Sequence, residues 1–145
     1  MKLTNQGFQK GYNPITVEGD CTHMNMDFGE LLMDKGDAVS YNEAKECIYV
    51  LVTGKVTFRW NGQEETVERN SCFHEDPILL HVPQNTPVEI ICQSDKAEVS
   101  IQRTTNPKTF AAKLMKSHDL LCGSEERGAG LMNEACTRIV RTFLD

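Results

Sequence analysis

Short runs of apolar residues that alternate with polar residues recur along most of the chain, separated by turn-forming residues. Most of these runs carry β-branched or aromatic residues at every second position, as is typical of half-buried strands. They cover residues 26–33, 48–52, 56–60, 65–68, 78–82, 88–92 and 97–103. Gly, Asn, Asp and Pro residues lie between the runs at short, regular intervals. This spacing predicts an all-β barrel or sandwich.

The pair Asn61-Gly62 predicts a tight hairpin, because both residues accept the positive φ values of a type I′ turn. Val56, Phe58 and Trp60 then share one face of the preceding strand. Lone aromatic residues at strand spacing usually pack in a core, so we interpret this stripe as core rather than as a stacking platform for a ligand.

The pattern changes after Arg103. Asn106 can cap a helix with Pro107 at its first position, and Phe110, Ala111, Leu114 and Met115 follow at helical spacing through Lys116. We therefore expect one short helix near the C-terminus. A solvated loop over residues 123–130, with Glu125, Glu126 and Arg127 at its tip, and a last strand over 138–144 complete the prediction.

Composition narrows the class of protein. The chain has 145 residues, which suits a single domain, and its net charge of −6 with scattered basic residues argues against a nucleic-acid partner. No apolar leader or membrane-length run is present, so we expect a cytoplasmic protein and no membrane contact. Six cysteines lie far apart without a Cys-x-x-Cys pair, which predicts free thiols rather than disulfides or zinc sites.

Two stretches have the frame of a metal-binding barrel motif. The first runs from Gly36 through Asn42-Glu43-Ala44 and Cys47 to Gly54, and the second from Pro77 through Pro83 to Val88. They resemble the paired motifs of the cupin family, whose ligands are two His, one Glu and a third His. The resemblance implies a double-stranded β-helix, or jelly-roll barrel, over residues 1–145. The ligand positions, however, hold Asn42, Ala44, Cys47 and Val88.

These four residues predict a site emptied of its metal and without a cofactor. A divalent metal needs three or four His or carboxylate donors at about 2.0–2.2 Å, whereas Asn42 and Cys47 offer at most two weak donors. Glu46 is one residue out of step, so strand alternation points its carboxylate away from Cys47. Val88, with Ile90 and Cys92, makes the inner face apolar.

The other polar residues do not form a recognisable catalytic motif. His74, Glu75 and His81 are the one cluster with ligand-like chemistry, and we weigh it against a solvated loop beside Pro77. No nucleophile elbow, Gly-rich phosphate loop or zinc-protease helix motif is present. We assign no catalytic residue.

A narrower resemblance covers nearly the whole chain in order. The segments are 11–16, 46–55, 69–77, 81–83 and 138–141, and they resemble the 5-deoxy-glucuronate isomerase family, which is related to 5-keto-4-deoxyuronate isomerase. That family has two cupin domains in tandem, and the catalytic divalent metal belongs to the C-terminal one. The resemblance implies that this chain corresponds to the N-terminal half, so no ligand of the family can be carried over to it.

Two hypotheses follow. In the first, the chain is the N-terminal cupin half of an aldose–ketose isomerase, an intramolecular oxidoreductase of inositol and carbohydrate breakdown, and is inactive alone. Its partner is then a C-terminal cupin domain or a second copy in a homodimer, and its ligand a small sugar acid. In the second, it is a free-standing metal-free cupin that serves as a sugar-binding or assembly module.

Overall fold

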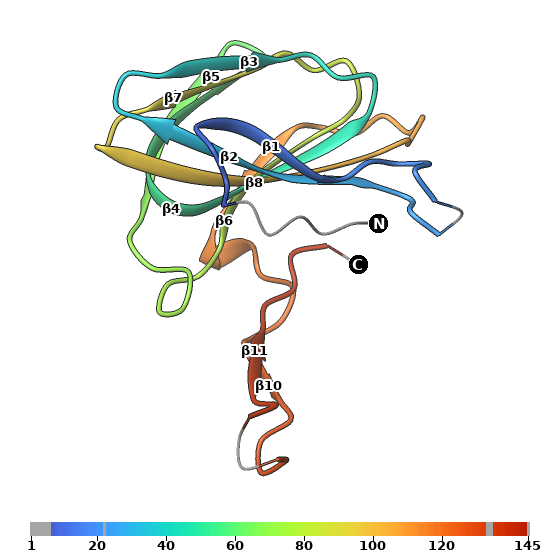
Figure 1. Ribbon diagram of the computed structural model, residues 1–145, viewed down its shortest axis with the longest axis vertical. Helices are drawn as coiled ribbons and strands as arrows, with labels where there is room; N and C mark the ends of the chain where they lie inside the picture. The colour runs from blue at the N-terminus through green and yellow to red at the C-terminus, as the bar shows by residue number, and fades with distance from the viewer. Residues whose placement is uncertain (1–6, 22, 133–134, 145) are drawn as a thin grey trace.

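The computed structural model describes residues 7–21, 23–132 and 135–144 and forms a β-barrel with a projecting C-terminal arm (Figure 1). One set of strands pairs in the order β1-β2-β8-β4-β6-β9, and a second set, β3-β7-β4-β5, shares β4 with it. The strands are β1 Gly11–Thr16, β2 Asp27–Asp34, β3 Ala38–Tyr41, β4 Glu46–Trp60, β5 Gln63–Arg69, β6 Ile78–Val82, β7 Val88–Cys92, β8 Lys96–Thr104 and β9 Lys113–Met115. The expected all-β jelly-roll fold is confirmed.

Strand β4 joins the two sheets. Its first half pairs with β8 and β6, and its second half pairs with β7 and β5. The register with β8 shifts between Leu51 and Thr53, and Gly54 follows with a φ of 99°. A Cβ at Gly54 would lie 2.5 Å from the Lys96 carbonyl oxygen. Glycine therefore permits the bend, and one strand continues where the sequence predicted two strands and a turn.

The core fills the space between the two sheets. Alternate residues of β4, from Cys47 through Tyr49 and Leu51, are buried, and their neighbours are partly exposed. Val56, Phe58 and Trp60 are buried on the second half of the strand, as the alternation predicted. Asn61 and Gly62 both have positive φ in the hairpin between β4 and β5. Core and hairpin thus follow directly from the two-residue period.

The predicted helix over residues 107–116 is wrong. Residues 113–115 form β9, which pairs with β6, and the helical element is a 3-10 turn, η1 Ser117–Asp119. The free edge of β6 supplies ladder hydrogen bonds that the short amphipathic segment could not match as an isolated helix. Phe110, predicted on the helix, stacks instead on the ring of His81 at 4.4 Å between centroids.

The C-terminal arm, residues 121–132 and 135–142, extends away from the barrel (Figure 1). Its strands β10 Glu125–Arg127 and β11 Arg138–Val140 pair with each other. The predicted loop tip at 125–127 is exposed but forms a strand, and the predicted last strand stops at Val140 rather than Leu144. Phe143 anchors the end of the arm by packing with Leu79 and Met115.

All six cysteines are free thiols, as their spacing predicted, and Cys47 and Cys92 are buried. Among the described residues, no helix has the length and hydropathy needed to cross a bilayer.

Candidate functional site

The four motif positions lie at one end of the barrel but differ in burial. Asn42 and Ala44 are exposed in the loop between β3 and β4. Cys47 on β4 and Val88 at the start of β7 are buried, with exposed fractions of 2% each. Val88 lies opposite Tyr41 on one side and Trp60 on the other. The inner face of β7 is apolar, because Ile90 and Cys92 are also buried.

A buried arginine stands among these positions. Arg103 on β8 pairs directly across the sheet with Cys47 and is 7% exposed. Its guanidinium lies over the ring of Tyr12, at 4.7 Å from the centroid, and over that of Tyr41, at 5.2 Å. It donates to the Tyr12 hydroxyl at 3.0 Å and pairs with Glu43 at 3.6 Å. We call these four residues, Arg103, Tyr12, Tyr41 and Glu43, the arginine cluster.

The electrostatics of the cluster favour a neutral thiol and a charged guanidinium. Burial raises the pKa of the Cys47 thiol, which donates to the Lys45 carbonyl at 3.4 Å. Burial also raises the pKa values of Tyr41 and Tyr49. Burial tends to lower the pKa of Arg103, but the interactions with Tyr12 and Glu43 outweigh it, so the pKa is raised. This end of the barrel therefore holds one fixed cation beside the protonated side chains of Cys47, Tyr41 and Tyr49.

These residues do not match the donor set of a divalent metal. Ala44 and Val88 have no donor atom, Asn42 is exposed, and the protonated Cys47 thiol is a poor ligand because metals bind the thiolate. The positive charge of Arg103 would also repel a metal ion at this place. Over residues 7–21, 23–132 and 135–144, no three His, Cys, Asp or Glu side chains are grouped so that they could hold a metal.

The second polar cluster predicted from the sequence is divided in the structure. His74 is exposed in the loop after β5 and hydrogen-bonds to the Ser71 hydroxyl at 2.9 Å, and Glu75 accepts from the backbone N–H of Asn70 at 3.1 Å. His81 lies apart from them on β6, with its Nε2 at 2.6 Å from Glu46 Oε1. The loop interpretation thus describes the positions of His74 and Glu75 better than a shared ligand cluster does.

Glu46 and His81 form a covered pair on the outer side of the first sheet. Glu46 points away from Cys47, as strand alternation predicted, and its second oxygen accepts from the Asn106 side chain. Burial tends to raise the pKa of Glu46, but the hydrogen bonds from Asn106 and His81 outweigh it and lower the pKa. This pair holds residues 106–110 against the sheet, since Phe110 covers the His81 ring.

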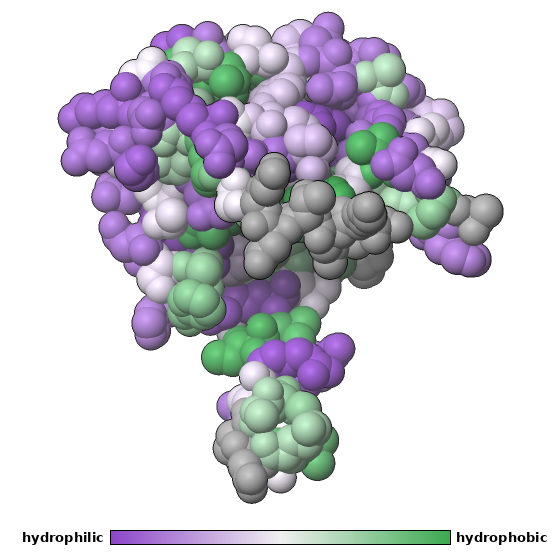
Figure 2. All heavy atoms as spheres, viewed as in Figure 1, coloured by the Kyte–Doolittle hydropathy of each residue, from purple (hydrophilic) through white to green (hydrophobic). Residues whose placement is uncertain are grey.

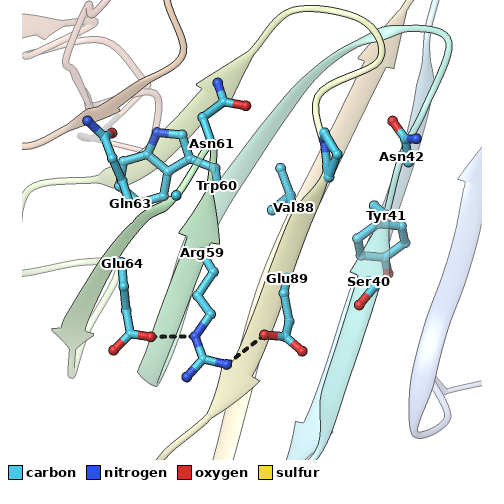
Figure 3. Close-up of a pocket in the computed structure, with 12 residues that line it drawn as sticks. Ser40, Tyr41, Asn42, Arg59, Trp60, Asn61, Gln63, Glu64, Val88 and Glu89 are labelled. Atoms are coloured by element: carbon cyan, nitrogen blue, oxygen red, sulfur yellow. Dashed lines mark hydrogen bonds and ion pairs between the residues drawn. The ribbon is translucent and has the colours of Figure 1, made fainter.

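An open pocket of about 530 Å³ lies at the end of the second sheet (Figure 3). Two adjacent rows of residues cross strands β3, β7, β4 and β5 there, as the strand registers show. The outer row is Ser40, Glu89, Arg59 and Glu64, and the inner row is Tyr41, Val88, Trp60 and Gln63. Asn42 and the Asn61-Gly62 hairpin complete the lining.

Sequence reasoning missed both the arginine cluster and this pocket. The sequence predicted Arg103 at the end of a strand. Strand alternation puts it on the same face as Ala97, Val99 and Ile101, which are buried, and this was the available signal. A charged residue in phase with a buried face is rare unless it has a partner.

Comparisons with solved structures support the fold. An IolB-like protein from Salmonella typhimurium LT2 superposes with a TM-score of 0.72 at 18% identity, over 82% of this chain and 44% of that one. The cupin domain of Cnp3 from Schizosaccharomyces pombe gives a TM-score of 0.52 at 11% identity, over 66% of this chain and 64% of that one. The chain thus spans less than half of the IolB-like protein.

A cupin superfamily protein from Desulfitobacterium hafniense DCB-2 also gives a TM-score of 0.52, at 10% identity, over 70% of this chain and 84% of that one. No curated protein matches the chain. The family model described as KduI/IolB family matches residues 2–145. With its cupin fold and this match over nearly its whole length, the chain belongs to the KduI/IolB family.

Proposed function

We propose that this chain is the metal-free cupin domain of a uronate isomerase and corresponds to the N-terminal half of a two-cupin enzyme. That enzyme would interconvert aldose and ketose forms of a deoxyuronic acid in cytoplasmic inositol or carbohydrate breakdown. Family membership supports the isomerase class. The observation that carries the metal-free assignment is Arg103, whose buried guanidinium stands beside Cys47 among the motif positions.

The arginine cluster gives this domain a structural role in the proposal. A metal ion would draw donor side chains together at the inner end of the barrel, and the guanidinium does the same through Tyr12, Tyr41 and Glu43. These contacts connect β1, β3, β8 and the loop before β4. The catalytic divalent metal then belongs to another cupin domain, and this barrel contributes stability and assembly rather than chemistry.

The metal-free assignment is tested by loading the purified chain. The protein is incubated separately with Mn²⁺, Fe²⁺, Zn²⁺ and Ni²⁺, gel-filtered and subjected to elemental analysis. We expect far less than one metal ion per chain, and one ion per chain would overturn the assignment. In parallel, the chain alone should not isomerise 5-deoxy-glucuronate with or without these metals. Turnover would contradict the proposal that another cupin domain carries out the isomerisation.

The C-terminal arm is the surface that we propose for contact with a second barrel. It exposes Leu131, Met132 and Ile139, with exposed fractions of 60%, 75% and 54%. Figure 2 shows apolar side chains on the arm below the barrel. A two-stranded hairpin is marginally stable alone, so covering this apolar surface stabilises it. In the complete enzyme the partner would be the catalytic cupin domain, and for the purified chain it is a second copy.

Sedimentation tests the assembly. At micromolar concentration we expect the chain to form a homodimer, and Ile139→Glu should shift it to monomer. Val17→Glu is the matched control, because Val17 is 43% exposed on the loop after β1, away from the arm. A monomeric wild-type chain would refute the dimer, and equal effects of the two variants would refute the role of the arm.

A further inference from the structure

The pocket in Figure 3 has hydrogen-bonding groups that the fold itself does not use. Its rim carries the side-chain amides of Asn42, Asn61 and Gln63, which are exposed and make no side-chain hydrogen bond with the described residues. Each amide offers donors and an acceptor. Three unused amides around one concavity favour a ligand that both donates and accepts hydrogen bonds.

Trp60 gives an independent indication of a ligand. Its side chain lines the pocket and is 6% exposed, yet its indole Nε1 is buried and has no partner among the described residues. Such donors are rare in native proteins, because an unpaired buried N–H costs about 1–3 kcal/mol. In Figure 3 the indole ring lies between the Asn61 and Gln63 side chains. A ligand hydroxyl would satisfy this donor when the side chains that cover Nε1 move aside.

The charges of the pocket select against anions. Arg59 is the one basic residue of the lining, and it is paired with Glu64 and with Glu89, the latter at 2.8 Å. One guanidinium and two carboxylates leave a net negative charge. A ligand carboxylate would therefore be repelled, whereas the glutamate oxygens can accept hydrogen bonds from neutral hydroxyls.

We propose that this pocket binds a neutral saccharide or polyol of about hexose size. The volume of about 530 Å³ is within the range of small-molecule sites. Amides and carboxylates would bind the hydroxyls, and Tyr41, Val88 and Trp60 give an apolar floor for the C–H faces of the ring. The inference is independent of the proposed isomerase role, because the ligand is neutral and no residue of the metal motif has to bind a metal.

The single tryptophan gives a direct measurement. The ¹H–¹⁵N correlation spectrum of labelled protein contains one indole cross-peak, that of Trp60. D-glucose, D-galactose and D-sorbitol are titrated as neutral probes, and D-glucuronate as an anion of matched ring size. We expect at least one neutral probe to move the indole cross-peak saturably and to bind more tightly than D-glucuronate.

Variants identify the groups responsible. Asn42→Ala combined with Gln63→Ala should weaken binding of the neutral probe about tenfold, the effect of losing two ordinary hydrogen bonds. Gln9→Ala is the matched control, since this exposed side chain donates to the Gly7 carbonyl away from the pocket. The proposal is overturned if no neutral probe gives a saturable shift, if D-glucuronate binds more tightly, or if the double variant binds as wild type does.

Discussion

Replacing Arg103 by Met tests whether the arginine cluster stabilises the barrel. Methionine keeps much of the volume of the side chain but removes the charge. The variant loses the 3.0 Å hydrogen bond to the Tyr12 hydroxyl, two cation–π contacts and the 3.6 Å pair with Glu43. These contacts join β8 to β1, to β3 and to the loop before β4, so their loss affects the closure of the barrel end.

The magnitude follows from these contacts and their burial. A hydrogen bond from a charged donor contributes about 1.5–3 kcal/mol, and each cation–π contact about 1 kcal/mol. The pair with Glu43 adds less than about 1 kcal/mol, because the Glu43 side chain is 36% exposed. Burying the guanidinium charge costs free energy, and this cost offsets several kcal/mol of the stabilisation from these contacts. We therefore expect Arg103→Met to lower the free energy of unfolding by about 2 kcal/mol.

Urea unfolding followed by Trp60 fluorescence measures the effect. A loss of about 2 kcal/mol moves the midpoint by roughly 1 M for a domain of this size. Arg127→Met is the matched control, because Arg127 forms an exposed pair with Glu125 and should change stability by less than about 0.5 kcal/mol. Tyr12→Phe alone and combined with Arg103→Met gives the coupling energy. An Arg103→Met variant as stable as wild type, or with no coupling to Tyr12, refutes the reasoning.

Three further variants test other parts of the structure. Burial raises the pKa of Glu30, which is 9% exposed with Oε2 unpaired, so Glu30→Gln should stabilise the protein by about 1 kcal/mol at pH 7. That gain should vanish in urea melts as the pH falls below the ordinary glutamate pKa, where wild-type Glu30 is also neutral. Glu46 has a lowered pKa, so its stabilisation is present above the ordinary glutamate pKa and is lost as pH falls through the lowered value. Acid titration should show a shallower loss for Glu46→Gln, and an unchanged slope would contradict this. Gly54→Ala should lower the thermal midpoint much more than Gly62→Ala, because a Cβ at Gly54 meets the Lys96 carbonyl whereas the one at Gly62 meets open space.

The sequence predicted the strands and most of the core because both depend on a local period of two. The runs at 26–33, 78–82 and 88–92 match β2, β6 and β7 within a residue. The continuity of β4 through Gly54 was not predicted, since a glycine between two runs indicates a turn as often as a bend. The helix over 107–116 failed for a tertiary reason, because the free edge of β6 lies far from that segment in sequence.

The candidate sites were harder to predict because they depend on pairings across strands. The sequence predicted an apolar inner face at Val88, and Cys47 and Val88 are both buried, but the motif frame gave no information on the arginine that lies beside them. Arg103 reaches that place because it pairs with Cys47 across the sheet. The aromatic rings that its guanidinium contacts, those of Tyr12 and Tyr41, come from β1 and β3. The pocket likewise combines residues of β3, β4, β5 and β7, so it exists only after all three registers are set.

The arginine cluster affects how the residues at the four motif positions are interpreted. Without Arg103, the Tyr12 hydroxyl and Glu43 would lose a charged partner at this end of the barrel, and unpaired polar groups are costly to bury. The Arg103 guanidinium supplies a partner for the Tyr12 hydroxyl and for Glu43 from within the chain, while its own Nε has no hydrogen-bond partner among the described residues. His or Glu donors introduced at the motif positions would lie beside the buried positive charge of Arg103, which disfavours a metal ion there. The arginine contacts join β1, β3 and β8 without a metal ion, which agrees with the supporting role that we propose for this domain.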